Sequence, residues 1–220
     1  MKNHSLALIA LSLVILTVPA TAGVVFDNYP INEYVGGWTI NGGYIVSDSF
    51  TLTSAATVNG VNFGVWLSYG STITNVDWSI GTAPYGNSLD SGAGAALSST
   101  PLGGLADGVY PVFSSTFSFP DLNLAAATYY LTLQNAVVTN GGAAFWNINN
   151  GPGIDVWESA RGNISPNDCY LVTFGTWGTC ASAFQILGPG GGAIPEPATW
   201  TLLGSGILVA FALRRKATRG

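Results

Sequence analysis

The segment Val61-Asn62-Phe63-Gly64-Val65-Trp66-Leu67 decides the predicted fold. Apolar residues take every second position, and the positions between them are polar or small apart from Trp66. A period of two is typical of a β-strand with one buried face. The same alternation recurs in residues 76–80, 117–119 and 129–133. The sequence therefore predicts a chain built mostly of strands.

Shorter apolar segments, separated by turn-forming residues, extend this pattern along the chain. They cover residues 44–52, 144–148, 170–174 and 183–187, and no sustained helical period interrupts them. Because Asn-Gly and Gly-Gly pairs favour tight turns, we expect an all-β fold, an antiparallel β-sandwich of about eight to ten strands; a jelly roll is one topology that fits.

Two regions are harder to assign. Asn59-Gly60 suits either a two-residue hairpin turn or a bulge inside one long strand, and the sequence does not choose between them. Residues 81–108 are rich in Gly, Ala and Ser and are expected to form a long surface loop.

The composition excludes several classes of protein. Of the 220 residues, 48% are hydrophobic and only 8% are charged, which argues against disorder, and the 29 glycines follow no triplet period, which argues against collagen. Six basic residues against eleven acidic ones make nucleic acid an unsuitable partner, because phosphate neutralisation needs clustered positive charge.

The charges divide the chain into three parts. Residues 23–194 hold ten of the eleven acidic residues but only one basic residue, Arg161, so their formal charge is −9. The other basic residues lie at the two ends, at Lys2 and beyond residue 213. We expect residues 23–187 to form an acidic ectodomain.

The N-terminal part, residues 1–22, is typical of a secretory signal peptide. Lys2 precedes an apolar stretch over residues 6–18, and the small-residue triplet Ala20-Thr21-Ala22 follows Pro19. Cleavage after Ala22 by signal peptidase, following export through the Sec translocon, is the favoured interpretation. The alternative is an uncleaved anchor, but the apolar run is shorter than the ~20 residues that a membrane span needs.

Export also bears on the two cysteines, Cys169 and Cys180. An oxidising compartment favours a disulfide between them, and the alternative is two buried thiols.

The C-terminal part is typical of a membrane segment preceded by a linker. Residues 188–194 are rich in Gly and Pro, and an apolar helix is expected over about residues 198–213. The basic tail of Arg214, Arg215 and Lys216 should stay cytoplasmic by the positive-inside rule, with the body outside.

Residues 195–216 resemble the PEP-CTERM sorting signal of Gram-negative bacteria that have an exosortase and make exopolysaccharide. The resemblance rests on Pro195, Glu196 and Pro197, the apolar helix and the basic tail, in that order. It implies that an exosortase recognises the motif, cuts near it, and leaves the body in the cell envelope or extracellular matrix after transient inner-membrane anchoring. An uncut C-terminal anchor is the alternative. Residues 23–187 also resemble uncharacterised secreted β-sandwich domains found upstream of this signal.

The expected ectodomain contains few residues of the types that carry out catalysis. The only histidine, His4, lies in the predicted signal peptide, so a Ser-His-Asp triad is excluded, as is a Cys-His pair. Asp155 and Glu158 are the closest pair of carboxylates beside an aromatic residue, and solvated loop acids are the plainer interpretation. We therefore assign no catalytic residue and expect no enzyme.

No metal site or cofactor is assigned either. Calcium is the one ion whose ligands are present, since Asn147, Asn149, Asn150 and Asp155 supply oxygens in a Gly-rich stretch. The spacing does not match an EF-hand loop, and asparagines are also common in turns.

Three tryptophans are candidate glycan contacts. Trp66 occupies one of the alternate strand positions that are otherwise polar or small. Trp146 and Trp157 flank an Asn/Gly-rich turn. Exposed indoles stack on sugar rings, although large aromatic side chains more often fill cores. The sequence favours a non-enzymatic protein that binds glycan or matrix. The alternatives are a structural or adhesive surface protein without a small ligand, and a carboxylate-dependent glycan hydrolase.

Overall fold

The computed structural model of the protein describes residues 23–28, 36–149, 156–160, 163–166, 168–171, 176–179 and 181–189. These residues form sixteen strands, and every pairing between them is antiparallel. The predicted antiparallel β-sandwich is confirmed, although the strands outnumber the eight to ten expected.

The larger sheet has eight strands and is organised around β4 (Ala56–Leu67). One edge of β4 pairs with β8 along most of its length, and the other edge pairs first with β16 and then with β10. The remaining members of this sheet extend it on both sides; their bounds, with those of the partners of β4, are β1 (Gly23–Asp27), β2 (Gly36–Thr39), β7 (Ser98–Ala106), β8 (Tyr110–Leu124), β10 (Ala144–Asn149), β15 (Ala181–Ser182) and β16 (Phe184–Gly188).

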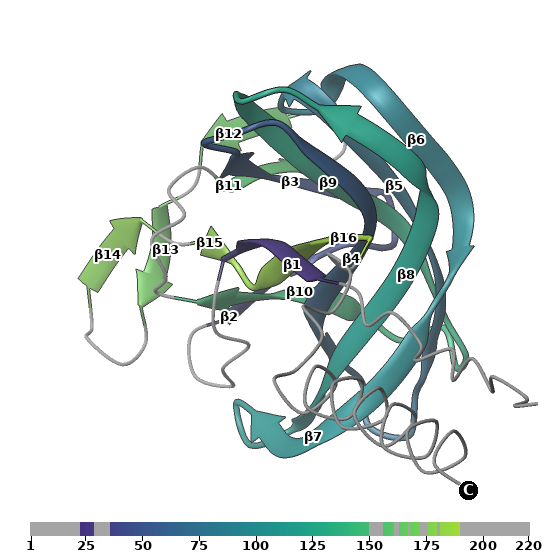
Figure 1. The fold of residues 1–220 in the computed structure, drawn as a ribbon. Coiled ribbons are helices and arrows are strands. Elements are labelled where there is room, and N and C mark those ends of the chain that lie inside the picture. The colour runs from purple at the N-terminus through teal and green to yellow at the C-terminus, as the bar shows by residue number, and fades with distance from the viewer. Residues whose placement is uncertain are drawn as a thin grey trace, which may run out of the picture.

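The second sheet has six strands in the order β12-β11-β3-β9-β5-β6. In Figure 1 its strands β3, β9 and β5 lie above β1, β16 and β10 of the larger sheet, and a separate two-stranded hairpin lies at the left. The strands of the six-stranded sheet and of the hairpin are β3 (Tyr44–Thr51), β5 (Ile73–Ala83), β6 (Gly86–Ala96), β9 (Thr128–Val138), β11 (Val156–Ala160), β12 (Asn163–Pro166), β13 (Asp168–Leu171) and β14 (Thr176–Thr179).

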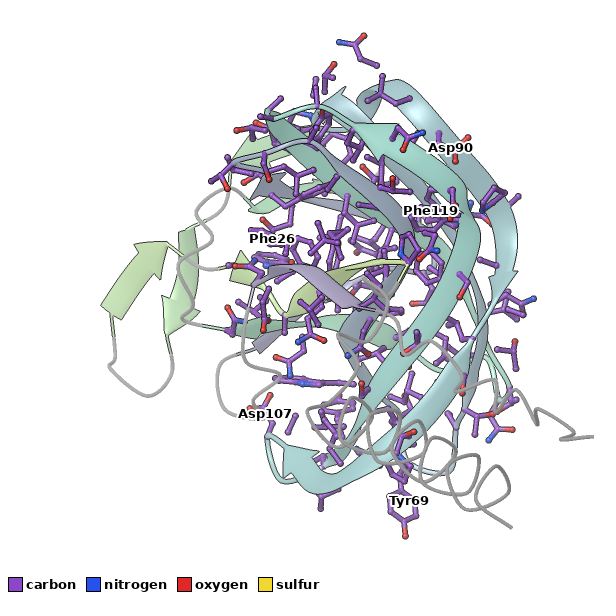
Figure 2. The ribbon with its side chains drawn as sticks, viewed as in Figure 1. Phe26, Tyr69, Asp90, Asp107 and Phe119 are labelled. Carbon is purple, nitrogen blue, oxygen red and sulfur yellow. The ribbon has the colours of Figure 1, made fainter. Side chains whose placement is uncertain are left out.

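The core between the sheets is rich in aromatic side chains. Phe50 of β3 contacts Phe26 and Phe184 of the facing sheet, with ring centroids 5.7 Å and 6.4 Å away. Trp78 of β5 stacks on Phe119 of β8 at 4.3 Å. Figure 2 shows Phe26 and Phe119 among the side chains that fill this space. Burial of such large rings supplies most of the favourable free energy of folding in a sandwich.

The period-two predictions for the core are confirmed. Val61, Phe63, Val65 and Leu67 of β4 are fully buried, as the alternation requires. The same holds for the alternating apolar residues of β5, β8 and β9: Val76, Trp78, Ile80, Phe117, Phe119, Tyr129, Leu131 and Leu133 are all buried.

The Asn59-Gly60 pair lies inside β4. It therefore forms a bulge within one long strand and not a two-residue hairpin turn. The ladder between β4 and β8 pairs Val58 with Leu122 and Gly60 with Ser118, so the register shifts at Asn59. The Asn59 amide donates to a carboxylate oxygen of Asp121 at 3.0 Å, which stabilises the irregularity.

The prediction of a long loop over residues 81–108 is wrong. β6 and β7 occupy most of this region and form the outermost strands of the two sheets at that side. Small residues are needed there because backbone and rings approach closely: a Cβ added at Gly92 would lie 2.5 Å from the indole nitrogen of Trp78. Both strands are largely exposed, so their sequences carry no apolar alternation that could reveal them.

Within the described part of the chain, no helix has the length and apolar character that crossing a membrane requires. The predicted signal peptide (1–22), the sorting segment (195–216) and its helix (198–213) lie outside the described residues, as does most of the linker (188–194).

We predict that Phe63→Ala lowers the free energy of unfolding by about 3 to 5 kcal/mol, because it leaves a cavity beside Phe117 and Trp146. Urea denaturation followed by circular dichroism measures the change. Tyr69→Ala is the matched control, since the Tyr69 ring is 82% exposed and points away from the ribbon in Figure 2. Equal effects of the two substitutions would contradict the assigned core.

Candidate ligand-binding face

Trp66 lies on the outer face of the larger sheet, as its place in the alternation predicts, but it is not exposed. Only 3% of its surface is accessible. Ala106, Tyr110 and Val112 from β7 and β8, and Phe145 from β10, pack around the indole. The interpretation of Trp66 as a glycan contact is therefore wrong, because a sugar cannot reach its ring in this fold.

Trp146 belongs to the core and is fully buried. Its ring packs against Phe63 and Phe184, and its indole nitrogen donates to the carbonyl of Ala183 at 3.2 Å. This correction has a simple physical reason: Trp146 pairs with Val65, whose side chain points inward, so neighbouring positions on adjacent strands share a face. Trp146 is therefore structural.

The third candidate, Trp157, pairs through its backbone with Ser47 of β3 and Pro166 of β12. Its side chain is outside the described residues. Its role in glycan contact stays a prediction.

A row of polar side chains crosses the outer face of the larger sheet. Gln185 of β16 donates to Asp27 of β1 at 3.2 Å, and Asn62 of β4 donates to Gln185 at 3.1 Å. On the other side of Asn62, Ser114 and Thr116 of β8 donate their hydroxyl hydrogens to its amide oxygen at 2.7 and 3.2 Å. These five residues, from four strands, are called the polar row below.

The sheet register explains why the polar row is continuous. Asp27 pairs with Gln185, Gln185 with Asn62, and Asn62 with Thr116, and directly paired residues project from the same face. β7 extends the face by one strand, because Ser98 pairs with Thr116 and Thr100 pairs with Ser114. Five adjacent strands therefore present polar side chains on one side.

The hydrogen bonds within the polar row fix the orientation of its side chains. They leave further hydrogen-bond donors and acceptors available for a ligand. An amide nitrogen carries two hydrogens, and those of Asn62 and Gln185 each donate one within the row. The oxygens of Ser114 and Thr116 use their hydrogens on Asn62 and keep lone pairs for a further donor. The four central residues are half-buried and Asp27 is exposed, so the row can be reached from solvent.

An aromatic cluster adjoins the polar row. Along β4, Asn62, Gly64 and Trp66 follow one another on the outer face, so the cluster around Trp66 starts where the row ends. Tyr110 and Phe145 are its half-buried members, with their rings 5.4 Å apart in an edge-to-face arrangement. The face thus combines hydroxyl-binding groups with partly accessible rings.

The described residues of this face carry acidic but no basic side chains. Every basic residue of the chain lies outside the described residues, and the acidic side chains here include Asp27 at the end of the row.

Several other predicted site residues lie apart from this face or outside the described residues. Asn147 and Asn149, half of the calcium set, are fully buried in β10, whereas Asn150 and Asp155 are not described. Glu158 is described only through its backbone in β11, opposite Val46. The geometry therefore does not test a carboxylate pair.

The predicted disulfide is also untested by the geometry. β13 holds Cys169 opposite Gly178 of β14, and Cys180 lies outside the described residues. The pairing of Cys169 with Cys180 stays a prediction.

Comparison with known proteins places a sorting motif at the C-terminus. Residues 193–216 match the PEP-CTERM protein-sorting motif, which confirms the resemblance carried by Pro195, Glu196, Pro197 and the tail of Arg214, Arg215 and Lys216. This motif implies processing by an exosortase and sorting of the protein to the cell envelope. No curated protein matches the chain.

We predict that Trp66→Ala lowers the free energy of unfolding by about 3 to 5 kcal/mol, because the side chain is enclosed by two strands and a neighbouring ring. Thermal or urea unfolding measures the loss. Leu105→Ala, at a half-exposed position of β7, is the control and should change stability by less than about 1 kcal/mol. A stable Trp66→Ala protein would show that the indole is accessible after all.

Proposed function

We propose that the protein is a non-enzymatic extracellular module that binds a neutral polysaccharide of the surrounding matrix through the polar row and the adjoining aromatic cluster. The observation that carries the proposal is the hydrogen-bonded row of amides and hydroxyls across β1, β16, β4 and β8. Sugar hydroxyls both donate and accept hydrogen bonds, and side-chain amides and hydroxyls offer both capacities.

The arrangement of the row supports binding rather than a purely structural role. Core-facing residues hold the same four strands together, so the outer face is not needed to close the sandwich. Polar groups that are already oriented by their neighbours lose little conformational entropy when a ligand arrives, which raises affinity.

The sorting motif supports the choice of ligand class. A protein delivered to the cell envelope meets the polymers that the cell itself secretes. Because residues 23–194 have a formal charge of −9, we favour a neutral polymer over an anionic one.

We predict that Asn62→Leu weakens binding to a neutral glucan or galactan at least tenfold. The substitution removes the residue that contacts Gln185, Ser114 and Thr116, so it disrupts the row at its centre. Affinity electrophoresis of the purified protein in gels containing each polysaccharide measures retardation.

Thr51→Val is the matched control for this experiment. The hydroxyls of Thr51 and Thr128 form a hydrogen bond of 2.9 Å on an exposed part of the six-stranded sheet. Thr51→Val therefore removes a comparable surface hydrogen bond away from the polar row. Equal retardation of wild type, Asn62→Leu and Thr51→Val would reject the site. Cell aggregation that depends on the protein without any retardation would favour an adhesive protein instead.

Processing at the sorting motif is tested separately. We expect replacement of Pro195, Glu196 and Pro197 by alanine to keep the C-terminal segment on the protein and to shift it to the membrane fraction, because exosortase no longer recognises it. Intact-mass measurement after cell fractionation distinguishes the cut from the uncut form. Thr218→Ala, outside the matched residues, should be processed normally. Normal cutting of the alanine variant would contradict the assignment.

A further inference from the structure

The first and the last strand of the sandwich lie side by side. β1 begins at Gly23 and β16 ends at Gly188, and these two residues are paired across the antiparallel ladder. Paired Cα atoms in such a ladder are about 5 Å apart. β1 lies at the edge of the larger sheet, and β16 lies between β1 and β4 (Figure 1). Both ends of the expected ectodomain therefore leave the fold at one point.

Gly188 fixes the point at which the chain leaves the sheet. The residue is buried, and a Cβ added to it would lie 2.6 Å from the carbonyl oxygen of Thr57 and 2.7 Å from a methyl group of Val25. Phe26 holds β1 against β16, because its ring packs on Phe184 with the centroids 5.6 Å apart. The packed part of the fold thus extends to residue 188.

Only a short segment separates this point from the sorting motif. Residues 189–194 lie between Gly188 and Pro195, and the seven steps from one Cα to the next span at most about 25 Å. β4 starts beside Gly188 and has twelve residues, which makes it about 36 Å long. While Pro195 lies at the membrane surface, the far end of β4 is therefore too distant to contact the bilayer if Gly188 points away from it.

Two turns lie at the same end of the sandwich as Gly188. They are residues 52–55, between β3 and β4, and residues 125–127, between β8 and β9. The first turn leads into Thr57 beside Gly188, and a backbone hydrogen bond of 3.0 Å joins the two turns. We call these turns, with the start of β1 and the end of β16, the tethered end.

The tethered end carries no charge. Residues 23–26, 51–58 and 122–128 contain no acidic or basic side chain. Acidic residues lie farther along both sheets: Asp27 and Asp121 belong to the larger sheet, and Asp77 and Asp90 belong to the six-stranded sheet. Because anionic lipids repel carboxylates, the tethered end meets a bilayer at a lower electrostatic cost than either sheet face does.

We propose that the membrane-anchored precursor lies with the tethered end against the lipid headgroups. This inference rests on the anchoring and processing at the sorting motif proposed above. β1, β16 and β4 then run away from the membrane. Asp27 lies four residues beyond Gly23, and Gln185 lies three residues before Gly188. The polar row therefore crosses these strands about 10 to 13 Å from the tethered end, parallel to the bilayer and open to a polymer.

Thiol labelling of the uncut precursor tests this orientation. The sample is spheroplasts that express the full chain with alanine at residues 195–197, which keeps the body anchored. Ala126→Cys places a thiol in an exposed turn of the tethered end, and Tyr69→Cys places one in the turn that follows β4 at its far end (Figure 2). We expect a bulky, membrane-impermeant maleimide to label Ala126→Cys about fivefold more slowly than Tyr69→Cys, because the thiol needs access to the reagent.

The matched control separates orientation from the intrinsic reactivity of the two thiols. In the body released by processing of the wild-type motif, Ala126→Cys and Tyr69→Cys should react at similar rates, because both positions are exposed in the fold. Labelling of the parent chain, which has only Cys169 and Cys180, is subtracted from each measurement.

Equal labelling of the two thiols in the anchored precursor overturns the proposed orientation, as does faster labelling of Ala126→Cys. Recovery of the alanine variant in the soluble fraction would instead reject the anchoring, and this orientation with it. Fractionation before labelling distinguishes the two failures.

Discussion

The alternation of side chains along β4 is the constraint on which the rest of the structure depends. Every second residue from Val61 to Leu67 enters the core, so Asn62 and Trp66 have to project from the other face. A slip of one residue would bury Asn62 and expose Phe63. Since β8, β10 and β16 all take their register from β4, both the aromatic core and the polar row follow from this one strand.

The sequence predicted the core well because burial leaves a period in the pattern of apolar residues. It did not predict β6 and β7, whose largely exposed Gly, Ala and Ser residues pair through their backbones and leave no such period. Trp66 shows a related difficulty. The alternation correctly places Trp66 on the outer face of its strand. The residues that cover it, however, lie forty or more positions later in the chain, and the pattern of one strand carries no information about them.

Only part of the polar row could have been predicted from the sequence. Asn62 stands out as a polar residue of an obvious strand, but Gln185 and Thr116 become its neighbours through long-range register. The burial of Asp48 depends even more on the fold: Asp48 lies in the predicted strand over residues 44–52, and that segment does not show which element will cover its side chain. Its burial follows from the position of β15 on the facing sheet.

The sorting motif implies sorting of the protein to the cell envelope, and we propose that the outer face of the larger sheet binds a neutral polymer there. The most direct test is nuclear magnetic resonance of the labelled protein titrated with neutral oligosaccharides. Our account predicts that the side-chain amide signals of Asn62 and Gln185 shift together and saturate with the ligand. Saturable shifts confined to the six-stranded sheet, with these two amide signals unmoved, would contradict it.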